Sequence, residues 1–283
     1  MKNQVSVSIF QKIAFAAGQA GWSLAVFGFT ELIFFFYLPP DNGTPLFKAF
    51  VYQGSVLKIF TIVGLLSAVG YMISAFMEPI VGMISDNASF KFGKRKTLMA
   101  FAVLPLAVLS ALVFFPLRDG VSAINTYWLI VTVLFAFIIK CFYTTPYSAL
   151  INEIATDAKE RLHIVMMISI AYAAGIGIGQ TINIILKVFE NQYTNEQIFK
   201  VSIIFYALIS FILMLMPILF VPDNSGKHLN HEAKQKHHFY DVLKDVWNDK
   251  NFRVLVIVEL IYWFPTKIFT IAVPYIVTAL LCL

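Results

Sequence analysis

The chain has 283 residues, of which 59% are hydrophobic, 16% aromatic and only 13% charged. Its mean hydropathy of +0.77 exceeds what a soluble domain of this length needs for one core, so the composition indicates an integral membrane protein. The formal net charge is +5, but Lys and Arg lie in short segments between apolar runs, which argues against nucleic-acid binding and for basic loops on the cytoplasmic side of a bilayer.

Seven apolar runs are long enough to cross a bilayer, which takes about 20 mostly apolar residues. The predicted spans are residues 13–38, 56–85, 97–117, 127–150, 165–189, 200–221 and 254–283. Basic residues concentrate in every second connection, beginning with Lys94, Arg95 and Lys96. Because such connections stay in the cytoplasm, we expect a multi-pass protein of the plasma (inner) membrane with a cytoplasmic N-terminus.

This pattern predicts three parts: a six-helix bundle at residues 1–222, a cytoplasmic linker at 223–253 and a seventh membrane helix at 254–283. Many transporters are built from two six-helix halves. We therefore interpret the chain as an amino-terminal half with the first helix of the second half, and we expect the rest of the second half as its partner. The linker contains four histidines without cysteine partners, so we predict no metal site there.

The connection between the second and third spans carries the first motif, G-x-x-x-D-x-x-x-x-x-x-G-K-R-K, which begins at Gly82 and includes Asp86, Gly93 and Arg95. It closely resembles the helix 2–helix 3 loop of the glycoside–pentoside–hexuronide:cation symporters, the melibiose-permease branch of the major facilitator superfamily. A second motif, PYSALINEIATDAKERL, begins at Pro146 and resembles that family's pattern after helix 4.

The resemblance implies an all-α membrane protein with the major facilitator fold, truncated to seven of twelve helices, that moves a sugar, glycoside or related organic solute together with a cation. It also implies a cytoplasmic gate formed by Asp86, Gly93, Arg95, Glu153 and Arg161. Independently, Asp86 lies at the C-terminal end of a helix, where the helix dipole disfavours a carboxylate. Asp86 therefore needs a cationic partner, although these charges also fit a purely orienting, solvated loop.

Glu78 and Lys140 lie deep inside predicted spans, where each charge costs about 2.5–3.5 kcal/mol and needs a partner. In the resembled family, two acids on helix 2 and one on helix 4 hold the coupling sodium; here Ser74 and Thr144 stand where two of them would be. We therefore hypothesise that the Lys140 ammonium lies against Glu78 as a built-in cation, and that coupling uses protons in preference to sodium or is absent. The alternative is a purely structural buried pair.

Polar and aromatic side chains inside the spans provide candidate contacts for the solute. Gln19 can hydrogen-bond hydroxyl groups, and Trp22 can stack on the C–H face of a sugar ring, although a tryptophan in a span also serves as packing or as an interfacial anchor. The predicted solute contacts are Gln19, Trp22, Ser23, Tyr143, Tyr147 and Trp263. In the fifth span, Ala171, Gly175 and Gly179 recur at intervals of four, a pattern typical of close helix packing.

Two alternative functions remain open for this sequence. A seven-helix receptor has seven spans as well, but it requires an external N-terminus, which the basic loop at Lys94–Lys96 contradicts. A transporter of an amphiphile such as a lysolipid fits the same fold, and the shortage of carboxylates among the predicted solute contacts keeps it open as the alternative to a sugar transporter. The sequence contains no phosphate-binding glycine loop, catalytic Ser/His/Asp set or zinc signature, so we expect neither an enzyme nor a cofactor.

Overall fold

The computed structural model describes residues 7–39, 46–56, 60–87, 93–155, 157–222 and 248–281, except for the side chains of residues 267 and 270–281. Its contacts divide the chain into two compact units, Met1–Lys227 and His228–Leu283. The regular secondary structure of the described residues is helical, and an isolated bridge between Val56 and Phe60 is the only extended pairing among them. The predicted all-α class is confirmed. Most of the predicted linker, residues 223–247, lies outside the described residues.

The first unit contains six helical spans, each long and apolar enough to cross a membrane, among the residues described. The first span is α1 (Ile9–Phe27), continued by the π-helical turn η1 (Gly28–Leu32) and by α2 (Ile33–Tyr37). The others are α3 (Ile62–Asn87), α4 (Lys94–Leu112), α5 (Ala123–Ile154), α6 (Ala158–Gln180) with α7 (Ile182–Phe189), and α8 (Asn195–Phe220). The second unit contains α10 (Lys250–Leu281).

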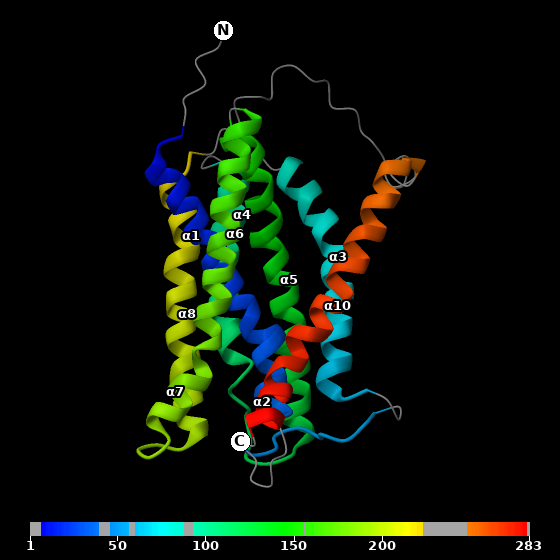
Figure 1. Cartoon of the computed structure of the whole chain (residues 1–283), viewed down its shortest axis with the longest axis vertical. Coiled ribbons are helices and arrows are strands. Elements are labelled where there is room, and N and C mark those ends of the chain that lie inside the picture. The colour runs from blue at the N-terminus through cyan, green and yellow to red at the C-terminus, as the bar shows by residue number, and fades with distance from the viewer. Residues whose placement is uncertain are drawn as a thin grey trace. The chain divides into compact units, whose positions relative to one another are not determined.

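Two helices organise the packing of the first unit (Figure 1). α1 packs against α6 and α8, whereas α5 packs against α3 and α4, and a contact between α4 and α8 joins the two groups. These contacts are symmetric along the chain. If the first, second and third spans exchange places with the fourth, fifth and sixth, each contact maps onto another contact of the same set. Such a pattern is expected for a half-transporter made of two three-helix repeats.

Several span boundaries differ from the prediction because apolarity shows which residues can lie in lipid, not where a helix begins or ends. The second span starts at Ile62, six residues late, since the preceding segment forms the Val56–Phe60 bridge. The fifth span is interrupted at Thr181, whose hydroxyl donates to the Ile178 carbonyl at 2.7 Å. A hydroxyl bonded to its own backbone in this way competes with regular helix geometry.

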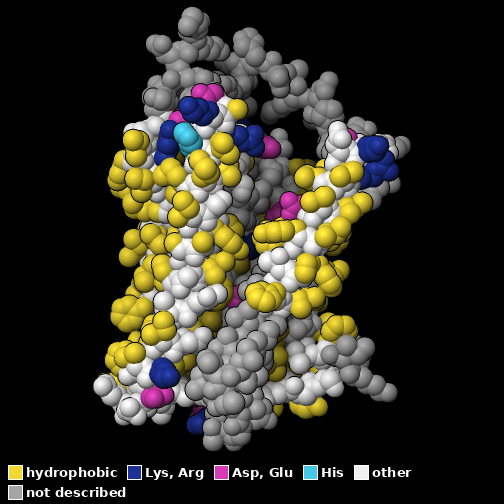
Figure 2. Space-filling model, viewed as in Figure 1, with side chains coloured by type: hydrophobic (Ala, Val, Ile, Leu, Met, Phe, Trp, Pro, Cys, Tyr) yellow, Lys and Arg dark blue, Asp and Glu magenta, His cyan; other side chains and the backbone are white. Residues whose placement is uncertain are grey.

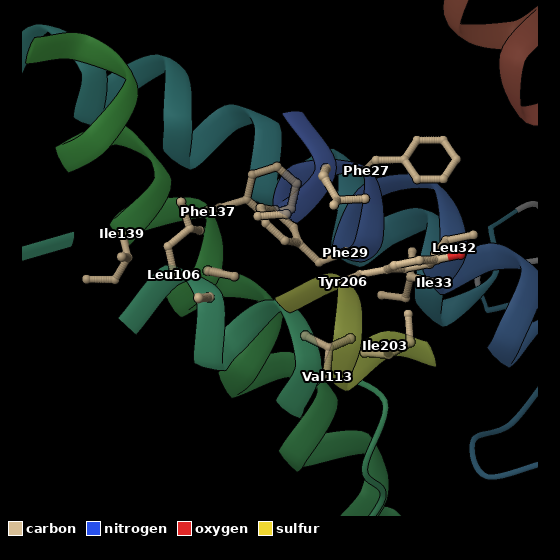
Figure 3. Close-up of a cluster of buried hydrophobic side chains, with 14 of the residues drawn as sticks. Phe27, Phe29, Leu32, Ile33, Leu106, Val113, Phe137, Ile139, Ile203 and Tyr206 are labelled. Atoms are coloured by element: carbon tan, nitrogen blue, oxygen red, sulfur yellow. The ribbon is translucent and has the colours of Figure 1, made fainter. Parts of the chain in front are cut away.

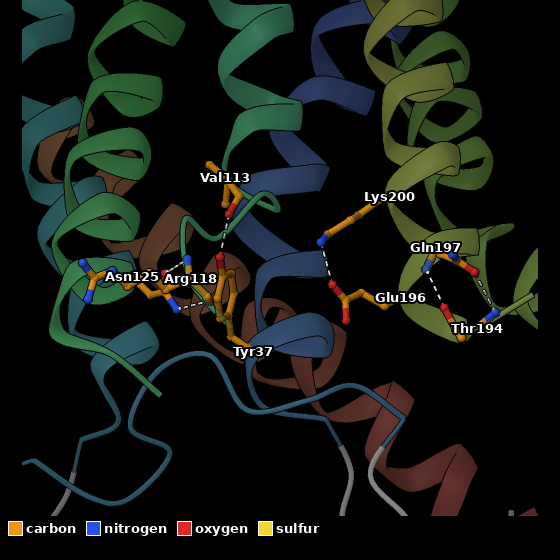
Figure 4. Close-up of polar contacts among 8 residues, drawn as sticks. All are labelled: Tyr37, Val113, Arg118, Asn125, Thr194, Glu196, Gln197 and Lys200. Atoms are coloured by element: carbon orange, nitrogen blue, oxygen red, sulfur yellow. Dashed lines mark hydrogen bonds and ion pairs between the residues drawn. The ribbon is translucent and has the colours of Figure 1, made fainter. Parts of the chain in front are cut away.

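The helix termini carry most of the polar interactions, and the apolar surface lies between them. Ser8 and Gln11 form a capping box at the start of α1, as do Thr194 and Gln197 at the start of α8 (Figure 4). On the face that carries α6 and α8, Figure 2 shows hydrophobic side chains between two ends with charged ones. This distribution suits a bundle whose middle lies in hydrocarbon.

Aromatic side chains fill the core near the ends of α2 and α4. Phe36 stacks on Phe199 at a centroid distance of 4.9 Å and on Phe50 at 5.6 Å. The Tyr37 hydroxyl donates to the Val113 carbonyl at 2.7 Å (Figure 4). Further buried apolar side chains join the first span to α4, α5 and α8 (Figure 3). The first span is therefore anchored along its length inside the bundle.

Glycines permit the closest helix contacts. A Cβ atom on Gly175 of α6 would lie 2.1 Å from the Ser23 Oγ and 2.4 Å from the Ala20 carbonyl oxygen of α1. A Cβ on Gly179 would lie 2.4 Å from the Phe27 ring. The predicted packing role of this small-residue stripe is confirmed.

Candidate functional site

The candidate ion-coupling residues meet where α3 packs on α5. A Cβ on Gly70 would lie 2.2 Å from the Phe137 ring, so the absence of a side chain lets the two helices approach. One turn further along α3, the Ser74 hydroxyl donates to the Phe137 carbonyl at 3.4 Å. After one more turn, the Glu78 Oε1 lies 3.4 Å from the Lys140 Nζ. The stripe at intervals of four on α3 therefore faces α5.

The two charges of this pair differ in exposure. The Lys140 side chain is 13% exposed and that of Glu78 is 48% exposed. The Thr144 hydroxyl donates to the Lys140 carbonyl at 3.1 Å, and the Ser74 hydroxyl is also bonded to backbone. The next acidic residues along α3 and α5 are Asp86 and Glu153, more than two turns away. The site thus combines one carboxylate, one ammonium and two hydroxyls bonded to backbone carbonyls.

Tyr143 and Tyr147, predicted as solute contacts, are completely buried and hold helices together. The Tyr147 hydroxyl donates to the Phe15 carbonyl at 2.7 Å, and its ring stacks on Phe15 at 4.3 Å. The Tyr143 hydroxyl donates to the Met214 carbonyl at 3.0 Å. In this conformation the two side chains tie α5 to α1 and α8, and neither is exposed to a solute.

The remaining predicted solute contacts fall in three environments. Gln19 and Ser23 are buried at 6% and 2% exposure, and the Ser23 hydroxyl donates to the Ala20 carbonyl at 3.1 Å. Trp22 is partly exposed and lies 6.2 Å from the Tyr172 ring, measured between centroids. Trp263, in the second unit, is exposed, and its indole N–H donates to Glu259 at 2.6 Å.

Arg95 is the centre of the charged cluster at the α3–α4 connection. Its guanidinium lies 2.7 Å from Glu153 and 3.8 Å from Asp86, and it donates to the Ala149 carbonyl of α5. The Lys94 ammonium donates to the Asp86 carbonyl at 2.9 Å, where the last carbonyls of α3 need donors. One arginine thus links the ends of α3, α4 and α5.

The other two predicted gate residues have separate positions. Gly93 caps α4 with φ +97°, a conformation that favours glycine, and its carbonyl accepts from the Thr97 hydroxyl at 2.8 Å. Arg161 is exposed and forms no ion pair with any residue that the structure describes. The structure therefore does not bring Arg161 into the Arg95 cluster.

A second ion pair at the same end was not predicted. The Lys12 Nζ of α1 lies 2.5 Å from the Glu160 carboxylate of α6, and the side chains are 19% and 10% exposed. The sequence contains one signal of it: the Ser8–Gln11 capping box places Lys12 in the first turn of a helix. The identity of its partner, 148 positions away in the chain, depends on tertiary structure.

Comparison with known proteins gives two results. Residues 20–281 match the family model described as MFS/sugar transport protein. The chain is also similar to an uncharacterized symporter, sll1374, of Synechocystis sp., with 27% identity over 184 residues. That match covers 62% of this chain and 30% of the relative. The matched region therefore spans less than a third of the symporter's length.

Proposed function

The chain belongs to the family of MFS/sugar transport proteins, and we propose that it forms the amino-terminal half of a symporter for a sugar, glycoside or related organic solute. The two motifs that resemble the glycoside–pentoside–hexuronide:cation symporters support this substrate class, and the similarity to a symporter supports coupling to an ion. Membership in a transporter family leaves no support for the seven-helix receptor alternative.

The coupling proposal rests on the Glu78–Lys140 pair. Hard cations bind best to sites with several anionic oxygen ligands, and here one carboxylate already faces an ammonium. A proton on Glu78 removes the partner of Lys140, and loss of that proton restores the pair. Protonation is thereby linked to the contact between α3 and α5. We propose proton coupling in preference to sodium coupling.

The Arg95 cluster serves as the cytoplasmic gate in this proposal. It joins the ends of three helices through contacts of Arg95 with Asp86, Glu153 and the α5 backbone. Charge pairs of this kind separate and re-form when one rigid bundle moves against another. The gate lies in the cytoplasm because Lys and Arg concentrate in these connections, and the bundle lies in the plasma (inner) membrane.

Trp22 is the proposed solute contact of the first unit, since it is partly exposed whereas Gln19, Ser23, Tyr143 and Tyr147 are buried. The apolar face of an indole can stack on the C–H groups of a sugar ring. Trp263, on the predicted seventh helix, is the proposed solute contact of the second half, and transporters of this kind bind their substrates near the middle of the membrane.

Uptake by the full-length transporter in proteoliposomes tests this function. Saturable uptake of a labelled sugar or glycoside, reduced by Trp22→Ala and competed by unlabelled sugar, is the expected result. Competition by a lysophospholipid and not by any sugar would show that the substrate is an amphiphile and not a sugar. Absence of saturable uptake of either class would contradict the proposal.

A further inference from the structure

A small pocket lies between the first span, α4 and α8, apart from the Glu78–Lys140 pair. Its walls include Leu24 and Gly28 from the first span, Ser110 from α4, and Ile203 and Ser210 from α8. Its space suffices for one water molecule and excludes an organic solute. It borders Gly28, where the first span changes from α-helix to the π-helical turn η1.

Ser110 and Ser210 each contribute a hydroxyl to this pocket, and a third lining residue, Tyr206, already shares a hydrogen bond with the Thr181 hydroxyl at 2.8 Å. Ser110 is 5% exposed, and its hydroxyl donates to the Ala107 carbonyl at 2.8 Å, which leaves the oxygen free to accept. Ser210 is completely buried, and its hydroxyl has no hydrogen-bond partner among the residues described. A buried hydroxyl without a partner is costly, and lipid around the bundle offers no replacement.

We propose that the pocket binds one structural water molecule, which accepts a hydrogen bond from Ser210 and donates one to Ser110. The donors and acceptors then balance: Ser210 gains its missing partner and Ser110 keeps its bond to Ala107. Buried waters typically make about two to four hydrogen bonds to such groups, and the two serines supply two. The water links α4 to α8 beside Gly28.

This site has a mechanical consequence for the first span. Direct packing of side chains fixes the distance between two helices, whereas a water-mediated bridge tolerates small changes in it. π-Helical turns occur frequently at functional sites. The water therefore lies beside the irregular turn of the first span. It also lies where α4 meets α8, the contact between the two groups of helices.

The site is tested by whether removal of the Ser210 hydroxyl raises or lowers the stability of the full chain in detergent. Removing an unpartnered buried hydroxyl stabilises a protein, whereas removing one that holds a water destabilises it. We expect Ser210→Ala to lower the apparent melting temperature by about 2 °C or more. An increase would overturn the proposal. The matched control is Ser202→Ala on the same helix, whose buried hydroxyl donates to the Ile198 carbonyl at 2.8 Å.

A double-mutant cycle separates the water from a local effect of Ser210. Ser110 and Ser210 share no direct hydrogen bond, so without a water their substitutions are expected to add. With the water, Ser110→Ala and Ser210→Ala each remove the same bridge, and the double variant is less destabilised than the sum. Additive effects for this pair, equal to those of Ser110→Ala with Ser202→Ala, would contradict the site.

A crystal or cryo-EM structure that resolves ordered solvent gives the direct readout. Solvent density within hydrogen-bond distance of both serine hydroxyls is expected. A Ser210 hydroxyl rotated to donate to a carbonyl of its own helix, with no solvent between the two serines, would overturn the proposal.

Discussion

At the scale of single residues, the proposed ion-coupling site pairs one ammonium with one carboxylate. Lys140 is nearly buried, while Glu78 is half exposed and lies 3.4 Å away. An ion pair in a low-dielectric setting contributes little net stability because desolvation offsets the attraction. Loss of one partner is costly, since it leaves the other charge without compensation. The pair is therefore better suited to a contact that breaks and re-forms than to one that only stabilises the fold.

Substitution of Lys140 tests the pairing. We expect Lys140→Met to destabilise the chain by about 1–3 kcal/mol, below the value for a fully buried pair because Glu78 is half exposed. The double variant Glu78→Gln/Lys140→Met should recover most of that loss, as measured by thermal unfolding in detergent. Lys187→Met, at an exposed position of α7, is the control and should have little effect. A double variant as unstable as the sum of the single ones would rule the pairing out.

The buried tyrosines permit a second test at this scale. Tyr147→Phe removes a hydroxyl that donates to the Phe15 carbonyl and keeps the stacked ring. We expect a loss of about 1 kcal/mol in stability with no change in the apparent affinity for solute. Tyr127→Phe, at a 69% exposed position of the same helix, should leave both unchanged. A large change in solute affinity with unchanged stability would restore Tyr147 to the solute site.

At the scale of elements, α1 depends on close contacts with its neighbours. A methyl group at Gly175 would overlap the Ala20 backbone and the Ser23 hydroxyl, and backbone cannot move aside as a flexible side chain can. Two positions later, Gly177 has nothing within 4 Å of its Cβ position. The same substitution at these two sites therefore isolates packing from helix propensity.

We expect Gly175→Ala to cost about 1–3 kcal/mol, as overpacked cores do. Gly177→Ala should be neutral or stabilising by up to about 1 kcal/mol, because alanine favours helix over glycine. Thermal unfolding of both variants in the same detergent gives the comparison. Equal effects at the two positions would show that α6 does not approach α1 in this way.

At the scale of the whole molecule, apolar runs in the sequence predicted the all-helical class and the six spans of the first unit. Intervals of four predicted that Ser74 and Glu78 share a face of α3. The hypothesis that Lys140 of the fourth span lies against Glu78 also indicated the helix that this face meets, and the two side chains lie 3.4 Å apart. The burial of Tyr143 and Tyr147 and the Lys12–Glu160 pair were missed. Periodicity defines a face, whereas its partner depends on packing between distant segments.

The orientation of the bundle can be tested with single cysteines. In a Cys141→Ser/Cys282→Ser background, we expect Lys159→Cys to react with a membrane-impermeant maleimide only after the cells are permeabilised. Lys159 lies in the first turn of α6, next to the Lys12–Glu160 pair. Tyr193→Cys, 60% exposed at the opposite end, should react in intact cells. The reverse pattern would place the Arg95 cluster outside the cell and rule out the proposed cytoplasmic gate.

Ion replacement in proteoliposomes that contain the full-length transporter tests the central claim most directly. Solute uptake driven by an inward proton gradient should persist when all sodium is replaced by choline, and Glu78→Gln should abolish the response to the gradient. Uptake that requires sodium and ignores the proton gradient would contradict the assignment of Glu78 and Lys140 as a proton-coupled pair.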